Sequence, residues 1–149
     1  MIPVETRRRG ARMDFKQKHN YLMGYRRKMA QIESDTVEYE RWVTIGAKMT
    51  QAFNAAPPSS GGTSSRVEKS GIELMEIYDK LQREIQEALR CRDRIRKVIN
   101  ERAKKPRYAE LLRWRYISGM TNAKIAEMIG KSEKTVSHAM VRAIETLDL

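Results

Sequence analysis

Four polar side chains near the C-terminal end of the chain are suited to hydrogen bonding with base edges in DNA: Glu133, Lys134, Ser137 and His138. A lysine donates to guanine O6 and N7, a glutamate accepts from cytosine N4, and serine and histidine serve in either role. Their spacing places them on the exposed N-terminal half of a helix that begins after Ser132. The pattern therefore predicts a helix that reads double-stranded DNA in the major groove.

A second set of residues is predicted to contact DNA phosphates: Thr121, Asn122, Lys131, Thr135, Arg142, Arg113 and Arg115. Thr121 and Asn122 begin the helix before the reading helix, where free backbone N–H groups attract anions. Two of these assignments have plainer alternatives. Arg113 and Arg115 could simply solvate a helix face, and Glu133 could be a first-turn residue that offsets the helix dipole instead of a base reader.

These side chains need a pair of helices joined by a tight turn. The sequence predicts one helix over 121–130 and a second over 132–147. Gly130 can take the positive φ that the turn demands, and Ser132 caps the second helix. The apolar and small residues that hold the pair together recur at helical spacing: Ile125, Ala126, Ile129, Gly130, Val136, Met140, Ala143 and Leu147. A third helix over 107–117 completes a three-helix core, and the domain is placed at 107–149.

The charge of the chain agrees with a nucleic-acid partner. Lys and Arg number 30 against 19 Asp and Glu, a net charge of +11, and such a field attracts polyanions. The excess lies toward the two ends, with 11 basic and 6 acidic residues in 1–50, and 9 and 5 in 104–149. Two alternatives stay open at this point: a basic protein with solvated charged faces, and a helical hairpin that binds another protein.

The upstream part of the chain reads as helix, linker and helix. Residues 1–13 form a basic arm that is expected to be disordered, and Met13 is an alternative start of the native protein. Apolar residues at helical spacing predict a helix over 14–53. The Pro, Ser and Gly residues of 54–66 predict a flexible linker. A heptad stripe then predicts a long amphipathic, coiled-coil-like helix over 67–103.

That long helix needs a partner, because it would measure about 50 Å, which is too long to stand alone in a chain of this size. It can fold back on the 14–53 helix, or it can pair with its copy in a second chain. The sequence does not decide between them. We expect a hairpin within the chain that also contributes, through 67–103, to a homodimer whose two reading helices occupy repeated half-sites.

Other function classes are disfavoured by what the sequence does not contain. Cys91 is the only cysteine, so no disulfide forms within the chain. No metal-ligand spacing, phosphate loop or nucleophile beside a base is present, so no enzyme activity, metal or cofactor is expected. No apolar run is long enough to span a membrane, and a cytoplasmic location is expected.

The C-terminal residues resemble region 4 of bacterial sigma factors. The resemblance covers about the last 45 residues, and it is carried by 112–121, by the Ile125–Ala126–Glu127 run with Gly130, by Ser132 and Val136, and by Arg142, Ala143 and Leu147. More narrowly, the chain resembles the RinA and ArpU type of late-gene activators, which are phage or prophage regulators with a stand-alone region-4-like domain. The resemblance implies a DNA-binding transcription regulator that acts in the bacterial host and positions or recruits RNA polymerase.

The expected architecture is thus all-α, with a long helical hairpin or coiled-coil segment followed by a three-helix, sigma region-4-like helix-turn-helix. The tip of the reading helix is Glu133-Lys134 where primary sigma factors often have Arg-Glu, so their target sequence does not carry over. The alternative function is the DNA-recognition subunit of a phage packaging machine, of the small terminase kind. Those subunits usually place their DNA-binding unit at the N-terminus, which favours the regulator. The sequence does not distinguish an activator from a repressor.

Overall fold

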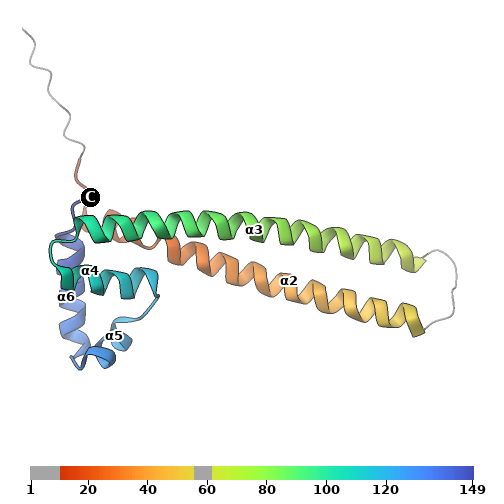
Figure 1. The fold of residues 1–149 in the computed structure, drawn as a ribbon. Helices are drawn as coiled ribbons and strands as arrows, with labels where there is room; N and C mark the ends of the chain where they lie inside the picture. Colours follow the sequence, from red (N-terminus) through yellow and green to blue (C-terminus); the bar gives the residue numbers. More distant parts are fainter. Residues whose placement is uncertain (1–10, 56–61) are drawn as a thin grey trace, which may run out of the picture. The chain divides into compact units, whose positions relative to one another are not determined.

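The computed structural model describes residues 11–55 and 62–149, and all regular structure in these ranges is helical (Figure 1). The predicted all-α fold class is confirmed. None of the helices described in these two ranges is both long and apolar enough to cross a membrane. In chain order the elements are α1 (Phe15–Leu22), α2 (Gly24–Ala55), α3 (Gly62–Arg102), α4 (Pro106–Leu112), the π-helical turn η1 (Arg113–Ile117), α5 (Asn122–Ile129) and α6 (Glu133–Glu145).

The chain divides into two compact units. The first, which we call the terminal unit, combines the chain up to residue 26 with residues 92–149. The second, which we call the hairpin unit, is residues 27–91. The helices α2 and α3 are each continuous across a unit boundary, so the hairpin unit is an insertion in the sequence of the terminal unit. The sequence placed the DNA-binding domain at 107–149, whereas the compact unit that contains those residues also takes in α1 and the end of α3.

The core of the terminal unit is built around α6. Helices α1, α4 and α5 each pack against α6. The largest fully buried side chains come from three separate stretches of the chain, and those from the first two are Leu22 in α1 and Ile95 and Ile99 in α3. The others come from the C-terminal stretch: Leu111, Leu112, Tyr116, Ile125, Val136 and Leu147. Burial of these apolar surfaces is what holds the three stretches together.

Polar contacts fix α1 against the C-terminal helices. The Lys18 ammonium is buried and donates to the backbone oxygen of Glu145 at the end of α6, over 2.9 Å. A cation there satisfies a carbonyl that has no partner within the helix and opposes the negative end of the helix dipole. His19 Nδ1 lies 2.7 Å from the hydroxyl of Tyr116. The N-terminal helix thus contributes both packing and hydrogen bonds to the terminal unit.

The prediction of one helix over 14–53 was wrong. The helix that begins after the Asp14 cap ends at Leu22, the backbone N–H of Met23 bonds back to carbonyls of α1, and α2 starts at Gly24. The apolar spacing continues through this break, so periodicity gave no sign of it. Of the predicted basic arm, residues 1–10 lie outside the described residues.

The hairpin unit pairs α2 with α3 in antiparallel fashion (Figure 1). Lys28 forms an ion pair with Glu87 over 3.4 Å, and Asp35 forms one with Lys80 over 3.3 Å. The two ion pairs are seven residues apart on each helix, and they run in opposite directions along the sequence. This spacing is one heptad on each helix of an antiparallel pair. The sequence left open whether the long helix folds back within the chain or pairs with its copy in a second chain. The structure contains the pairing within the chain.

The ordered helices extend into the predicted linker. Helix α2 continues to Ala55 and α3 begins at Gly62, where the sequence placed a linker over 54–66 and a helix from 67. The intervening residues 56–61 lie outside the described residues.

Two carboxyl groups lie in the seam of the hairpin. Asp35 is buried, and it accepts from the Gln31 amide and pairs with Lys80. Burial raises the pKa of Glu84 above its ordinary value. The pKa of Asp35 is lowered, chiefly by a hydrogen bond with Glu84. Asp35 Oδ2 lies 3.3 Å from the Lys80 ammonium, whereas Glu84 Oε2 has no hydrogen-bond donor while both carboxyl groups are ionised. A proton on Glu84 supplies that hydrogen bond, so the two groups favour opposite protonation states.

Candidate nucleic-acid interface

The predicted reading helix is α6, and the turn before it has the expected geometry. Gly130 ends α5 in the left-handed region at φ 67°. The Thr121 hydroxyl caps α5 by accepting from the backbone N–H of Lys124, and Ser132 Oγ caps α6 by accepting from the N–H of Thr135 at 3.1 Å. These caps satisfy backbone donors that no helical bond can reach and fix where each helix starts.

The face of α6 opposite the core carries the predicted base readers. Glu133, Lys134 and His138 are all exposed. Ser137 is half-buried, and its hydroxyl oxygen lies 3.3 Å from the amide nitrogen of Asn122, which donates to it. Lys134 and His138 are four residues apart and therefore lie one above the other on the helix surface. The first turns of α6 thus present a cation, a carboxylate and an imidazole, while Ser137 ties α6 to the start of α5.

A basic cleft lies beside this face, between α6 and the start of α4. Its volume is about 370 Å³. Three cationic side chains line it, Lys105, Arg107 and Arg142, together with Tyr108, Thr135, His138 and Ala139. The Lys105 ammonium lies 5.4 Å from the centre of the Tyr108 ring, within cation–π range. Three cations and a hydroxyl around an open cleft form a suitable environment for a phosphate group.

Sequence reasoning assigned Thr135 and Arg142 to phosphate contact but missed Lys105 and Arg107. The sequence prediction ended the long helix at 103 and gave Lys105 no role. Lys105 is the N-cap of α4, with Pro106 in the first helical turn. A cluster of basic residues at the start of the first helix of the three-helix domain is a signal that could have identified the cleft.

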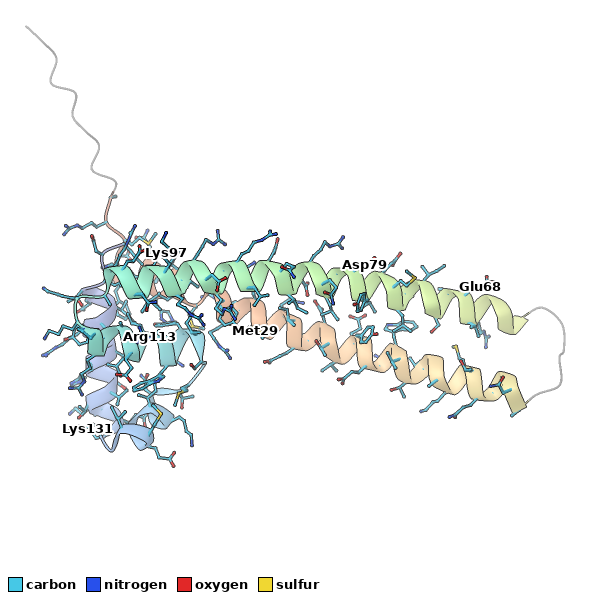
Figure 2. All side chains as sticks on the ribbon, in the orientation of Figure 1. Met29, Glu68, Asp79, Lys97, Arg113 and Lys131 are labelled. Carbon is cyan, nitrogen blue, oxygen red and sulfur yellow. The ribbon has the colours of Figure 1, made fainter. Side chains whose placement is uncertain are left out.

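The two arginines of η1 are engaged within the terminal unit. Arg113 Nη1 donates to the side chain of Asn100 over 2.7 Å, and Arg115 Nη1 donates to the backbone oxygen of Met120 over 3.3 Å. Both side chains are half-buried. The sequence left phosphate contact and solvation of a helix face as alternatives for these two arginines. In the structure both side chains bond to other residues of the protein. Lys131, in contrast, lies exposed in the turn between α5 and α6 (Figure 2).

The helix predicted over 107–117 changes type midway. The α-helical bonding of α4 ends at Leu112, and the turn Arg113–Ile117 is π-helical, with the N–H of Ser118 bonded to the oxygen of Arg113. Tyr116 in this turn is buried, and burial raises its pKa to about 12. Gly119 follows at φ 72°, a conformation that favours glycine, and a Cβ there would require the Arg26 guanidinium to move. A π-helical turn inside a helix is uncommon, and no helical periodicity predicts it.

Burial separates the predicted core residues into two groups. Six of the eight are buried: Ile125, Ala126, Val136, Met140, Ala143 and Leu147. Ile129 is only half-buried and Gly130 is exposed, so both were wrongly placed in the core. The reason is their position at the C-terminal end of α5, where the chain turns toward α6. Gly130 matters for its backbone conformation rather than for packing. Ile144 is buried as well and was not predicted.

Within 11–55 and 62–149, no three His, Cys, Asp or Glu side chains lie close enough together to hold a metal ion. Cys91 is a buried free thiol in α3.

Comparison with known proteins bears on the same residues. Residues 105–147 match the family model described as Sigma-70, region 4. No curated protein matches the chain, and no solved structure matches it. The matched range starts at Lys105 in the basic cleft and covers α4, η1, α5 and α6. The C-terminal part of the chain is a sigma region 4-like helix-turn-helix, a fold of DNA-binding regulators.

Proposed function

We propose that this protein is a sequence-specific, double-stranded DNA-binding transcription regulator. The observation that carries the proposal is the exposed first half of α6, with Glu133, Lys134 and His138 beside a basic cleft, inside a region 4-like helix-turn-helix. In this family of folds the second helix of the pair lies in the major groove. Function thus divides between α6, which reads bases, and the cleft, which holds the backbone.

Base reading is assigned to the side chains at the start of α6. Lys134 donates to guanine, and Glu133 accepts from cytosine N4. His138 lies one turn further along, so it reaches a neighbouring base pair. Ser137 accepts a hydrogen bond from Asn122, so its main role is to position α6 against α5. Contact with a base is its secondary role.

Phosphate contact is assigned to the basic cleft and to the exposed turn. Lys105, Arg107 and Arg142 surround the cleft, with Thr135 supplying a hydroxyl, and Lys131 lies in the turn. Phosphate contacts set register and orientation without reading sequence. They also release counterions, so they make binding depend on salt. The start of α5, at Thr121 and Asn122, adds backbone N–H donors.

The test is selection of binding sites from a random duplex library with the full-length protein. Wild type is expected to enrich one motif, and Lys134→Ala/His138→Ala is expected to lose or relax it at a few positions. Each lost base contact corresponds to about 1–3 kcal/mol of discrimination. The matched control is Lys124→Ala, since Lys124 is exposed on α5 and paired with Glu127. Enrichment that is identical in all three proteins would remove the base-reading assignment.

The cleft is tested by salt dependence. Arg107→Ala is expected to weaken binding to every sequence alike and to reduce the slope of log affinity against log salt by roughly 1. The same substitution at a base contact changes sequence preference instead. An unchanged slope for both Arg107→Ala and Arg142→Ala would place the backbone contact elsewhere.

The proposal extends to the regulated process. The resemblance to RinA and ArpU type regulators supports a late-gene activator encoded by a phage or prophage, which positions or recruits RNA polymerase in the cytoplasm of the bacterial host. Transcription in vitro with bacterial RNA polymerase, on a template that carries the selected motif upstream of a promoter, tests this directly. More transcript in the presence of the protein supports activation. Less transcript indicates a repressor, and an unchanged level argues against both.

A further inference from the structure

An apolar groove lies in the hairpin unit near the ends of its two helices. Its volume is about 270 Å³. It is lined by nine residues from both helices, none of them charged: Val43, Gly46, Ala47, Met49, Thr50, Val67, Ser70, Gly71 and Leu74. A third of the residues of this chain are charged, so an uncharged groove is a marked departure from the rest of the sequence. It disfavours DNA as the occupant, because no cationic side chain lines it to offset the phosphate charge.

A large apolar side chain projects beside the groove. Met75 is 69% exposed, and it lies four residues after Gly71 on the same side of α3. One surface thus carries both a groove and an apolar projection. A two-fold interface brings the same patch of two copies together, so each copy must supply both a projecting side chain and a groove that receives one. The patch described here has both features.

The packing of the hairpin unit leaves room for a side chain at Gly71. A Cβ built at Gly71 would meet nothing within 4 Å, and the residue lies inside α3 with no need for positive φ. Glycine inside a helix is unfavourable relative to alanine. Gly46, across the groove, is different, since a Cβ there would touch Ser70 and Leu74. The open site at Gly71 suits the close approach of a helix from outside the chain.

Ser70, at the floor of the groove, is buried to 5% exposure, and its hydroxyl has no hydrogen-bond partner. A buried hydroxyl without a partner is unfavourable. A Cβ built at Gly46 would lie 3.6 Å from the Ser70 oxygen, so this hydroxyl lies between α2 and α3 and marks incomplete packing at this end of the hairpin unit.

We propose that this groove is the self-association surface of the protein, and that its occupant is the hairpin unit of a second copy. The product is a four-helix arrangement with two-fold symmetry. The proposal rests on the proposed function, since two reading helices on repeated half-sites supply the specificity that one lacks. It also narrows the expected dimer region of 67–103, because Ile95 and Ile99 at the far end of α3 are buried inside the terminal unit.

The available area is sufficient. A helix of about 28 residues measures ~42 Å, and two helices side by side are ~20 Å wide, so one face of the hairpin unit offers roughly 800 Å². A standard stable interface buries about 800 Å² on each partner. The hairpin unit can therefore support a dimer without any surface from the terminal unit.

The experiment is sedimentation of the full-length protein over a wide concentration range. Wild type is expected at twice the chain mass of 17.4 kDa. Gly71→Glu places a charge in the groove while the Cβ meets no atom of its own chain, so the fold of the monomer is retained. Its dimer dissociation constant is expected to rise more than about tenfold. Lys69→Gln is the control with the same change of net charge, because Lys69 is exposed on the side of α3 away from the groove.

Three results would overturn the proposal: a wild type that is monomeric throughout, a mass that corresponds to a ring of many subunits, or equal dimer affinity for Gly71→Glu and Lys69→Gln. DNA-binding measurements distinguish a failure of the dimer proposal from a failure of the proposed function. With one half-site, Gly71→Glu is expected to bind as wild type does, and with two half-sites it is expected to lose cooperativity. Absence of specific DNA binding by wild type would reject the proposed function and leave the mass result standing.

Discussion

Substitution of Leu22 by alanine tests whether α1 is part of the DNA-binding unit. Leu22 is fully buried, although it lies far from α6 in the sequence. Replacing a buried leucine with alanine costs 2–5 kcal/mol in protein cores, and we expect about 3 kcal/mol here. For a unit of this size, each kcal/mol shifts the melting temperature by roughly 4–8 °C, so the expected loss is about 12–24 °C.

The assay uses the two tryptophans of the chain. Trp114 lies in the terminal unit and Trp42 in the hairpin unit, so Trp42→Phe leaves Trp114 as the single reporter of the terminal unit. Thermal unfolding is then followed by fluorescence with and without Leu22→Ala. Phe15→Ala is the control, since Phe15 belongs to the same helix but is 41% exposed. Equal melting temperatures for the two variants would refute the inclusion of α1 in the unit.

Three further substitutions have expected effects. Ser132→Ala removes the cap of α6 and is expected to cost about 1 kcal/mol and to weaken DNA binding. Burial raises the pKa of Glu84 above 4.5, so the hairpin unit loses stability as the pH rises through that raised pKa, and Glu84→Gln is expected to raise the urea midpoint at neutral pH. The pKa of Asp35 is lowered from its ordinary value of 3.8, so its ionised carboxylate stabilises the hairpin unit. This stabilisation is lost as the pH falls below 3.8 and through the lowered pKa. Because burial raises the pKa of Tyr116 from 10.0 to about 12, the terminal unit is expected to lose stability as the pH rises through that range, and Tyr116→Phe to remove that loss.

Each of these has a result that would contradict it. Ser132→Thr retains the capping oxygen, so the same loss in Ser132→Thr as in Ser132→Ala would reject the capping argument. A urea midpoint for Glu84→Gln that falls at neutral pH would show that the ionised carboxylate stabilises the hairpin. Phenol absorbance that titrates completely near pH 10 in the folded protein would reject the buried environment of Tyr116.

The helix-turn-helix was predictable because its signals are local. Gly130 and Ser132 mark the turn, and Val136 follows at the spacing at which α6 returns to the core, all within seven residues. Cap chemistry and helical periodicity act over such distances. The hairpin was predictable only as one of two pairings. An apolar stripe on a long helix indicates that another helix packs against it, but it does not show whether that helix belongs to the same chain.

The rest of the terminal unit was not predictable from local pattern. The bond from Lys18 to Glu145 joins residues 127 positions apart, and no periodicity links them. The break at Met23, in contrast, had a local signal, because Gly24 follows it and glycine is unfavourable inside a helix. The basic cleft was missed for a related reason, because Lys105 and Arg107 belong to α4 and meet Arg142 only in the folded unit.

The assembly of the terminal unit from two distant stretches has a consequence during synthesis. Helix α1 leaves the ribosome early, but its partners in α3 and α6 are made only after the whole hairpin unit. At 5–20 residues per second, the remaining chain of about 120 residues takes roughly 6–25 s to appear. During that interval the hairpin unit can fold, while α1 has no surface to pack on. Only a completely translated chain can therefore acquire a stable DNA-reading surface, and a prematurely terminated product has none.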